Sequence, residues 1–117
     1  MFDQHRIFAD DFIPLLKKMA ARFPEKKIAV EAASIEEALA FAEAGADIVQ
    51  CERFTPVDLT VLVTKLRAEK PSVKILAAGG INADNSREYA ATEVDVLVTS
   101  WVYFGKPEDI KMKFSRI

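Results

Sequence analysis

The sequence has few of the residues and patterns that mark specialised classes of protein. Its 117 residues include one cysteine, one histidine and four glycines. The single cysteine, Cys51, excludes an internal disulfide framework and is typical of a reducing compartment. Four glycines and five prolines exclude a collagen-like or low-complexity chain. No apolar run approaches the ~20 residues of a membrane span, and no signal-peptide pattern follows Met1.

The chain also lacks a charge excess of either sign. It has 16 basic and 18 acidic side chains, so its formal net charge is −2. Nucleic acids and anionic membrane surfaces recruit strongly basic proteins, so neither is expected as a partner. Half of the residues are apolar, which excludes intrinsic disorder, and the length suits one domain. Together these features predict a single cytoplasmic domain.

Short apolar runs alternate with amphipathic segments along the whole chain. The runs are rich in valine and isoleucine, and they occupy residues 28–30, 48–51, 73–77 and 94–98. They mostly lack the alternation of a half-solvated sheet, which is typical of parallel strands covered on both faces. Repeated βα units with right-handed crossovers predict an α/β fold with a parallel sheet, either doubly wound or curled toward a barrel.

The segments between the runs have helix signals. Residues 34–37 form a capping box, and Gly45 is placed to end the helix that follows it. Pro56 suits the first position of another helix. Leucine and valine then recur at helical spacing and predict its buried stripe, at Leu59, Leu62, Val63 and Leu66. Further helices are expected over residues 11–22 and from 82 or 84 to about 91, with a short final turn at 106–110.

The first residues suggest that the sequence is a piece of something longer. Residues 1–5 resemble the end of a strand followed by a loop, with the strand itself missing. About four parallel strands would leave open edges and an apolar inner face. We therefore expect the chain to form a homodimer through a two-fold contact.

Two acids follow consecutive predicted strands. Sites in parallel α/β folds form where strands end and the loops to the helices begin. Glu31 and Glu52 would lie there on the same rim, close enough to share a metal ion or to bind ribose hydroxyls. The alternative is that each is a solvated strand-end acid without a role.

Small and hydroxyl residues follow the two later strands. Gly79 and Gly80 precede a predicted helix, so the N–H groups here, including that of Ile81, could approach an anion. Thr99 and Ser100 follow the next strand, and loops after two adjacent late strands form the phosphate site of many barrel enzymes. These five residues predict a phosphate cradle, although a glycine pair alone is also common in turns.

Other candidate residues have a non-functional interpretation as well as a functional one. His5 is either a loop histidine without a role or part of a site. Arg6 and Arg53 could pair with an anionic substrate, whereas most exposed arginines bind nothing specific. Cys51 is expected to be a buried small hydrophobe. Residues 101–104, Trp-Val-Tyr-Phe, are expected to pack against a neighbouring element, with ligand stacking as the alternative.

Several stretches together resemble the catalytic domain of quinolinate phosphoribosyltransferase, also called nicotinate-nucleotide pyrophosphorylase (carboxylating). They are 30–32 (VEA), 34–38 (SIEEA), 44–50 (AGADIVQ), 54–56 (FTP), 78–82 (AGGIN) and 94–96 (VDV). Residues 2–6 and 99–111 resemble the branch of this family encoded in molybdenum-transport operons. The resemblance covers essentially the whole chain. It implies a type II phosphoribosyltransferase fold, an incomplete TIM-like α/β barrel, of which residues 1–117 are the C-terminal portion without the N-terminal domain.

The resemblance implies transfer of a phosphoribosyl group from phosphoribosyl pyrophosphate to an aromatic acid such as quinolinate or a nicotinate-like acid. Family acids matching Glu31 and Glu52 lie near the ribose and Mg²⁺, so both are expected as catalytic residues and metal ligands. Residues matching the 79–80 glycine pair and Ser100 hold the 5′-phosphate. His5 matches a histidine of the basic wall where a dicarboxylate would bind.

The sequence departs from the family pattern at Phe2, at 52–53 and at 76–78. These changes weaken the match to the family's quinolinate-binding site, whereas the match to its phosphate cradle is kept. Activity is expected of the parent protein and is left open for these 117 residues alone. The alternative function is a non-catalytic phosphate- or nucleotide-binding or assembly module associated with molybdenum transport.

Overall fold

A computed structural model describes residues 3–6, 11–108 and 110–116 of the chain. Helices and strands alternate, as the sequence predicts. In chain order the elements are α1 (Asp3–Arg6), α2 (Phe12–Arg22), β1 (Ala29–Ala32), α3 (Ile35–Glu43), β2 (Ile48–Glu52), α4 (Pro56–Glu69), β3 (Lys74–Ala78), α5 (Ser86–Ala90), β4 (Val96–Leu97) and the 3₁₀ turn η1 (Trp101–Tyr103). None of the helices in the described part of the chain is long and apolar enough to cross a membrane.

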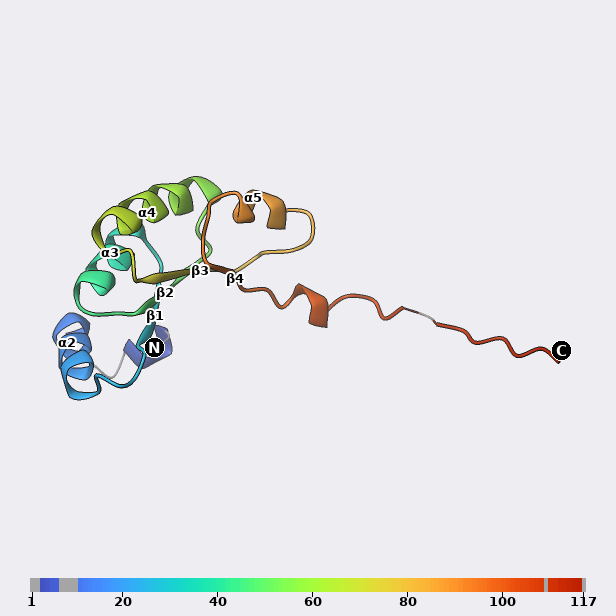
Figure 1. Cartoon of the computed structure of the whole chain (residues 1–117), viewed down its shortest axis with the longest axis horizontal. Helices are drawn as coiled ribbons and strands as arrows, with labels where there is room; N and C mark the ends of the chain where they lie inside the picture. The colour runs from blue at the N-terminus through green and yellow to red at the C-terminus, as the bar shows by residue number, and fades with distance from the viewer. Residues whose placement is uncertain (1–2, 7–10, 109, 117) are drawn as a thin grey trace.

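The strands form one parallel sheet in the order β1-β2-β3-β4. Each strand lies beside its predecessor, and α2, α3, α4 and α5 follow the same side of the curved sheet (Figure 1). A doubly wound sheet would reverse its strand order and cover both faces with helices. The described strands therefore form an arc of a barrel, which decides between the two α/β arrangements open at the sequence level.

The core lies between the sheet and the helices. Side chains alternate between the two faces of a strand, and the residues on the helix side are buried. From the strands these are Val30, Ala32, Val49, Cys51, Ile75 and Ala77. They meet the predicted stripe of α4, in which Leu59 and Leu62 are fully buried. Each such leucine contributes roughly 1.5–3 kcal/mol of burial free energy.

The other face of the sheet has no helix over it in the described part of the chain. Across the strands, one row of this face consists of Glu31, Gln50, Leu76 and Val96 in register. Leu76 is half-buried and Val96 is exposed. The sequence suggested strands covered on both faces, because apolar residues such as these interrupt the alternation. In the described part of the chain, helices cover only one face.

The helix signals at residues 34–37, 45 and 56 are confirmed, whereas the helix expected from residue 82 or 84 begins only at Ser86. Ser34 Oγ accepts a hydrogen bond from the N–H of Glu37 at 3.2 Å, as expected for the capping box. Thr55 caps α4 in the same way, with Pro56 in its first turn. Gly45 has φ +106°, and a Cβ at this position would lie only 3.1 Å from the Ala20 side chain. Glycine is therefore required here both by the backbone conformation and by the approach of α2.

Two aspartates, which the sequence analysis did not single out, join the strands at the rim where they begin. Asp47 accepts a hydrogen bond from the N–H of Ile28 at 2.9 Å, and Asp95 accepts one from the N–H of Ile75 at 2.8 Å. The bond from Ile28 helps to hold the pKa of Asp47 below its ordinary value. Burial alone would raise the pKa of Asp95. The hydrogen bonds from the N–H of Ile75 and the guanidinium of Arg67 outweigh this effect, so the pKa of Asp95 is lowered.

Three expectations about the ends of the chain need correction. Residues 3–6 form the short helix α1, not the end of a strand and a loop; Met1 and Phe2 lie outside the described residues. The turn expected over 106–110 is not formed by its described residues. The final strand is shorter than the apolar run 94–98, because only Val96 and Leu97 pair with β3.

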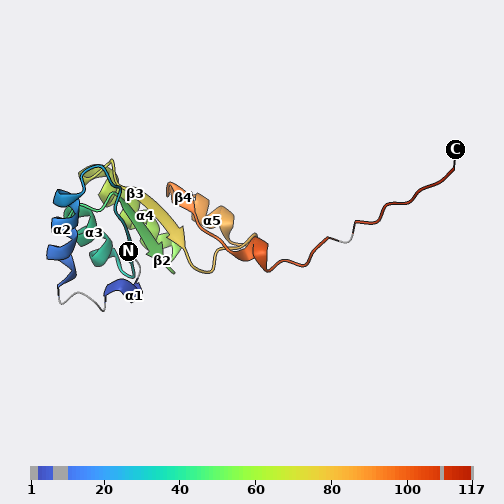
Figure 2. The same cartoon turned by 90° about the horizontal axis from the view of Figure 1, so that it is seen from below.

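Beyond η1 the chain leaves the body of the molecule. Residues 104–108 and 110–116 are exposed and have no helix or strand. They extend away from the sheet in both views, and the longest dimension of the molecule is 71 Å (Figures 1 and 2). Nothing in this segment contributes to the core.

Candidate functional site

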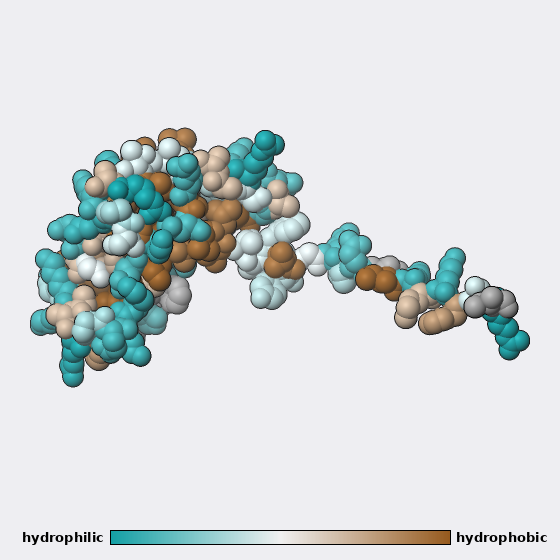
Figure 3. Space-filling view, viewed as in Figure 1, coloured by the Kyte–Doolittle hydropathy of each residue, from teal (hydrophilic) through white to brown (hydrophobic). Residues whose placement is uncertain are grey.

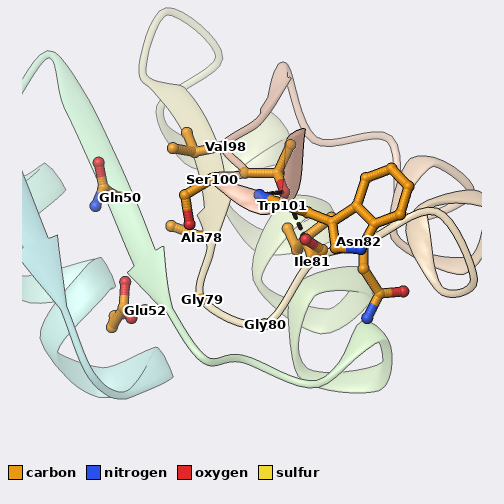
Figure 4. Close-up of a pocket in the computed structure, with 11 residues that line it drawn as sticks. Gln50, Glu52, Ala78, Gly79, Gly80, Ile81, Asn82, Val98, Ser100 and Trp101 are labelled. Carbon is orange, nitrogen blue, oxygen red and sulfur yellow. Dashed lines mark hydrogen bonds between the residues drawn. The ribbon is translucent and has the colours of Figure 1, made fainter. Parts of the chain in front are cut away.

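A pocket of about 510 Å³ lies where β2, β3 and β4 end (Figure 4). This is the rim on which the sequence analysis placed the site, as expected for parallel α/β folds. The lining residues are Gln50, Glu52, Ala78, Gly79, Gly80, Ile81, Asn82, Val98, Thr99, Ser100 and Trp101. All five predicted phosphate-cradle residues and one of the two predicted acids therefore come together here.

The two glycines of the cradle are needed for different reasons. Gly79 has φ +88°, and a Cβ there would lie 2.7 Å from both Arg53 Cγ and Glu52 Oε1. The backbone of β3 thus passes directly against the residues that end β2. Gly80 has φ +73° but open space around it, so only its conformation demands glycine.

Backbone donors of this loop are left uncommitted. The carbonyl of Ala78 accepts from the N–H of Arg53, on the β2 side, so the N–H of Gly79 points toward the β4 side. The carbonyl of Gly80 accepts from Asn85 Nδ2, so the N–H of Ile81 points away from Asn85. Among the hydrogen bonds of the described residues, none is donated by the N–H of Gly79, Gly80 or Ile81. Such donors can bind an anion.

Two asparagines hold the loop in place. The N–H of Asn82 donates to Asn85 Oδ1 at 2.8 Å, and Asn82 Oδ1 accepts from the N–H groups of Asp84 and Asn85. The sequence analysis treated this region only as a helix start. The spacing of the asparagines just after the glycine pair was the available signal, because short amide side chains bond to nearby backbone in turns.

Thr99 ties the two cradle loops together. Its hydroxyl donates to the carbonyl of Ile81 at 2.5 Å and accepts from the N–H of Trp101 at 3.1 Å. Because its hydrogen is already used, Thr99 positions the loops rather than donating to a ligand. Ser100 also lines the pocket (Figure 4).

Glu52 and Arg53 mark the border with a second pocket. Glu52 faces the first pocket, and its Oε1 lies 3.8 Å from Arg53 Nε. The Arg53 side chain is 85% exposed and lines a neighbouring pocket of about 310 Å³ together with Ser34, Phe54 and Asp58. Its backbone has φ +57°, a conformation that costs an arginine on the order of 1 kcal/mol. Arg53 therefore lies beside Gly79, near the predicted phosphate cradle, in a strained conformation.

Glu31 lies on the same face of the sheet but outside the lining of the pocket. It is in register with Gln50, two residues before Glu52 along β2, so the acids are diagonal neighbours at roughly 8 Å between Cα atoms. No group of three or more metal-ligating side chains occurs among the described residues. Mg²⁺ needs only one or two protein carboxylates when substrate oxygens complete its shell, so this pair fits it.

His5 and Arg6 are not brought to this pocket. Arg6 pairs with Glu37 at 2.7 Å and lies 5.4 Å from the ring centroids of Phe12 and Phe41. The hydrogen bond from Arg6 holds the pKa of Glu37 below its ordinary value, although burial opposes it. His5 is exposed on α1. Substrate binding by either residue stays a prediction.

Two other expectations can be compared with the structure. Cys51 is fully buried on the helix side of β2, as predicted, and burial raises the pKa of its thiol to about 12. It is therefore protonated and unreactive at neutral pH. Trp101 was expected to pack against a neighbouring element, but it is 51% exposed and lines the pocket.

The fold and the pocket define a βα-repeat protein with a pocket at the ends of its strands. The model of the quinolinate phosphoribosyl transferase C-terminal domain matches residues 1–113. The chain belongs to this family.

Known proteins agree with this assignment. Nicotinate-nucleotide pyrophosphorylase (carboxylating) of Rattus norvegicus is 41% identical over 83 residues, 71% of this chain and 27% of the rat protein. The pyrophosphorylase ModD of Escherichia coli O157:H7 is 30% identical over 115 residues, 96% of this chain and 40% of that protein. The chain thus spans well under half the length of these curated relatives.

A solved structure supports the fold. Nicotinate-nucleotide pyrophosphorylase from Francisella tularensis superposes with a TM-score of 0.71 at 23% identity, covering 83% of this chain and 34% of that one. At this identity the likeness concerns the fold alone. It agrees with the interpretation of the sheet as part of an α/β barrel.

Proposed function

We propose that this chain forms the phosphate-binding part of a phosphoribosyltransferase, which transfers phosphoribosyl from phosphoribosyl pyrophosphate to an aromatic carboxylate. The observation that supports this is the set of uncommitted N–H groups at Gly79, Gly80 and Ile81 beside Ser100. These donors would hold the 5′-phosphate. The family of the chain supplies the reaction class.

Glu52 would act on the ribose, because its side chain lines the pocket. In the transfer, a bond forms between an acceptor ring atom and ribose C1, while the C1–O bond to pyrophosphate breaks and its electrons leave with pyrophosphate. Positive charge develops at C1, and a carboxylate facing the pocket stabilises it. Glu52 and Glu31 would hold Mg²⁺, which when bound supplies neutralising charge to the leaving pyrophosphate.

Arg53 would bind a second anionic group of the substrates, and Trp101 would bind the aromatic acceptor. Arg53 can meet a second anionic group at the border of the two pockets, since its side chain is exposed beside Glu52. The half-exposed indole of Trp101 offers a face on which an aromatic acceptor can stack.

Calorimetric titration with phosphoribosyl pyrophosphate, with and without Mg²⁺, tests the proposal. We expect Mg²⁺-dependent binding that falls at least tenfold in Glu52→Gln, whose stability stays within about 1 kcal/mol of the parent. Glu43→Gln is the matched control, because Glu43 pairs with Lys70 away from the pocket. Unchanged binding in Glu52→Gln would remove this acid from the site. Release of pyrophosphate with a panel of pyridine carboxylates then tests turnover.

The second candidate function is a non-catalytic phosphate- or nucleotide-binding or assembly module. The specific observation in its favour is that the described residues of the pocket lining include no lysine, arginine or histidine to stabilise a leaving pyrophosphate. Binding of phosphoribosyl pyrophosphate without turnover of any acceptor would favour this module. Absence of binding would contradict both candidates.

A further inference from the structure

Packing alone does not fix the glycine pair of the phosphate cradle. Gly79 and Gly80 both have a positive φ, and glycine has more backbone freedom than any other residue. Gly79 lies against Arg53 and Glu52, whereas no atom lies within 4 Å of the position that a Cβ of Gly80 would take. The conformation of Gly80 therefore depends on the hydrogen bonds of its peptide groups.

The side chain of Asn85 supplies one of these hydrogen bonds. Its Nδ2 donates to the carbonyl of Gly80 at 2.9 Å, and its Oδ1 accepts from the N–H of Asn82 at 2.8 Å. One planar amide thus holds a carbonyl and an N–H on either side of Ile81, in the loop that borders the pocket (Figure 4). Because the C=O and N–H of a trans peptide point in opposite directions, the bond to Gly80 also sets the direction of the Ile81 N–H.

Thr99 holds the next peptide from the other side. Its hydroxyl donates to the carbonyl of Ile81, while the N–H of Asn82 in the same peptide donates to Asn85. The loop is therefore held both from the start of α5 and from the segment after β4. Among the hydrogen bonds of the described residues, none that holds the loop is donated by the N–H groups of residues 79–81.

Asn85 does not use its side chain to cap its own helix. Asparagine is a preferred N-cap, because its side-chain oxygen can accept from the first N–H groups of a helix. Asn85 is the N-cap residue of α5, yet its side chain makes no capping hydrogen bond. Asn82 Oδ1 instead accepts from the N–H groups of Asp84 and Asn85. The amide of Asn85 is thus directed to the glycine loop, which indicates a role outside the helix.

The helix α5 makes a second polar contact, which does not reach the cradle. The hydroxyl of Tyr89 donates to the carbonyl of Phe54 at 2.9 Å, after the end of β2. None of the five residues of α5 is buried, and Figure 3 shows hydrophilic residues around the part of the body where Figure 1 places this helix. Hydrogen bonds therefore contribute to holding α5 in place, and Tyr89 provides a comparison for Asn85.

We propose that Asn85 is a positioning residue of the phosphate site. Its amide holds Gly80 and Asn82 so that the backbone N–H groups of residues 79–81 are preorganised for a phosphate group. Asn85 does not itself line the pocket, so it acts through the loop and not on the ligand. Preorganisation raises affinity, because binding then does not have to order the loop. The inference rests on the proposed function, whose phosphate site it concerns.

Calorimetric titration of the full chain with inorganic phosphate tests the proposal. We expect Asn85→Ala to bind phosphate about tenfold more weakly with an unchanged circular dichroism spectrum, since the loop must then be ordered on binding. Tyr89→Phe is the matched control, because it removes one hydrogen bond of α5 but none of the cradle, and its affinity should stay within twofold of the parent. Unchanged affinity in Asn85→Ala, or an equal loss in Tyr89→Phe, would overturn the proposal and leave the proposed function standing. Absence of phosphate binding by the parent chain would contradict both.

Asn85→Asp tests the donor to Gly80 separately, and it changes the size of the side chain little. The new carboxylate can still accept from the N–H of Asn82, but it donates to the Gly80 carbonyl only when it is protonated. Affinity for sulfate, whose charge is constant in this range, should be weak at pH 7.5 and recover toward the parent value at pH 4.5. Ser86→Asp adds a carboxylate at the next position and controls for charge alone. Parent-like affinity of Asn85→Asp at pH 7.5, no recovery at pH 4.5, or equal recovery in Ser86→Asp would overturn the proposal.

Discussion

The two rims of the sheet differ in how their polar groups are hydrogen-bonded. At the rim where the strands begin, Asp47 and Asp95 each bond a neighbouring strand and a basic side chain. At the rim where they end, donors of residues 79–81 have no partner among the described residues, and Arg53 is strained. A rim whose groups bond one another stabilises the sheet, whereas one with spare donors is available to a ligand. Substitutions at the two rims should therefore separate stability from binding.

Gly79→Val should have the largest effect, because it affects both properties. The new side chain meets Arg53 and Glu52 at 2.7 Å in a conformation of φ +88°. We expect a loss of roughly 2–4 kcal/mol in unfolding free energy and loss of phosphate binding. Urea unfolding and calorimetry measure the two effects. Gly80→Ala, which meets open space, should cost less stability; equal losses would contradict the steric argument.

Asp95→Ala should affect stability alone. It removes acceptors for the N–H of Ile75 and for Arg67, whose Nη2 lies 2.7 Å away. We expect the unfolding free energy to fall by about 1.5–3 kcal/mol, because hydrogen bonds to a charged group are lost. Phosphate affinity should stay within twofold of the parent. A large loss of affinity would mean that the two rims are coupled.

Acid should destabilise the rim where the strands begin. The pKa values of Asp47 and Asp95 at this rim are lowered in the folded chain, as is that of Glu37 near the end of β1. Their stabilisation is complete above the unfolded pKa values of about 4. It is lost as pH falls through the folded pKa values, since the unfolded chain then binds more protons. Thermal unfolding from pH 6 to pH 2.5 should show Tm falling below about pH 4. The fall should be shallower in Asp95→Asn.

Arg53→Asn should have the smallest effect on stability, and of the opposite sign. Asparagine tolerates the left-handed conformation better than arginine, so we expect a gain on the order of 1 kcal/mol. The same change should weaken binding of pyrophosphate several-fold. Glu93→Asn, at φ +63° outside the pocket, should gain stability without losing affinity. If Arg53→Asn also keeps full affinity, Arg53 has no role in binding.

Local signals predicted the helices between the strands and the rim on which the candidate pocket lies. Ser34 and Thr55 cap helices through bonds to residues three positions away, and such bonds depend only on nearby sequence. The glycine pair and Ser100 could be placed at strand ends because apolar runs precede them. Their meeting in one pocket follows from parallel strands, whose ends share a rim.

Other residues acquire their roles only through contacts distant in sequence. The hydroxyl of Thr99 donates to the carbonyl of Ile81, 18 positions away, and so connects the two loops. Arg6 pairs with Glu37, 31 positions away, instead of facing the pocket. No local pattern contains such partners.

The sequence by itself determined the alternation of strands and helices, the caps, the buried stripe of α4 and the residues at the strand ends, because short-range hydrogen bonds and periodic burial decide them. Only the tertiary structure decided that the strands follow one another in order with helices on one side, and that Glu52 lines the pocket while Glu31 does not. Strand pairing and sheet curvature decide these, since both depend on contacts between residues far apart in the chain.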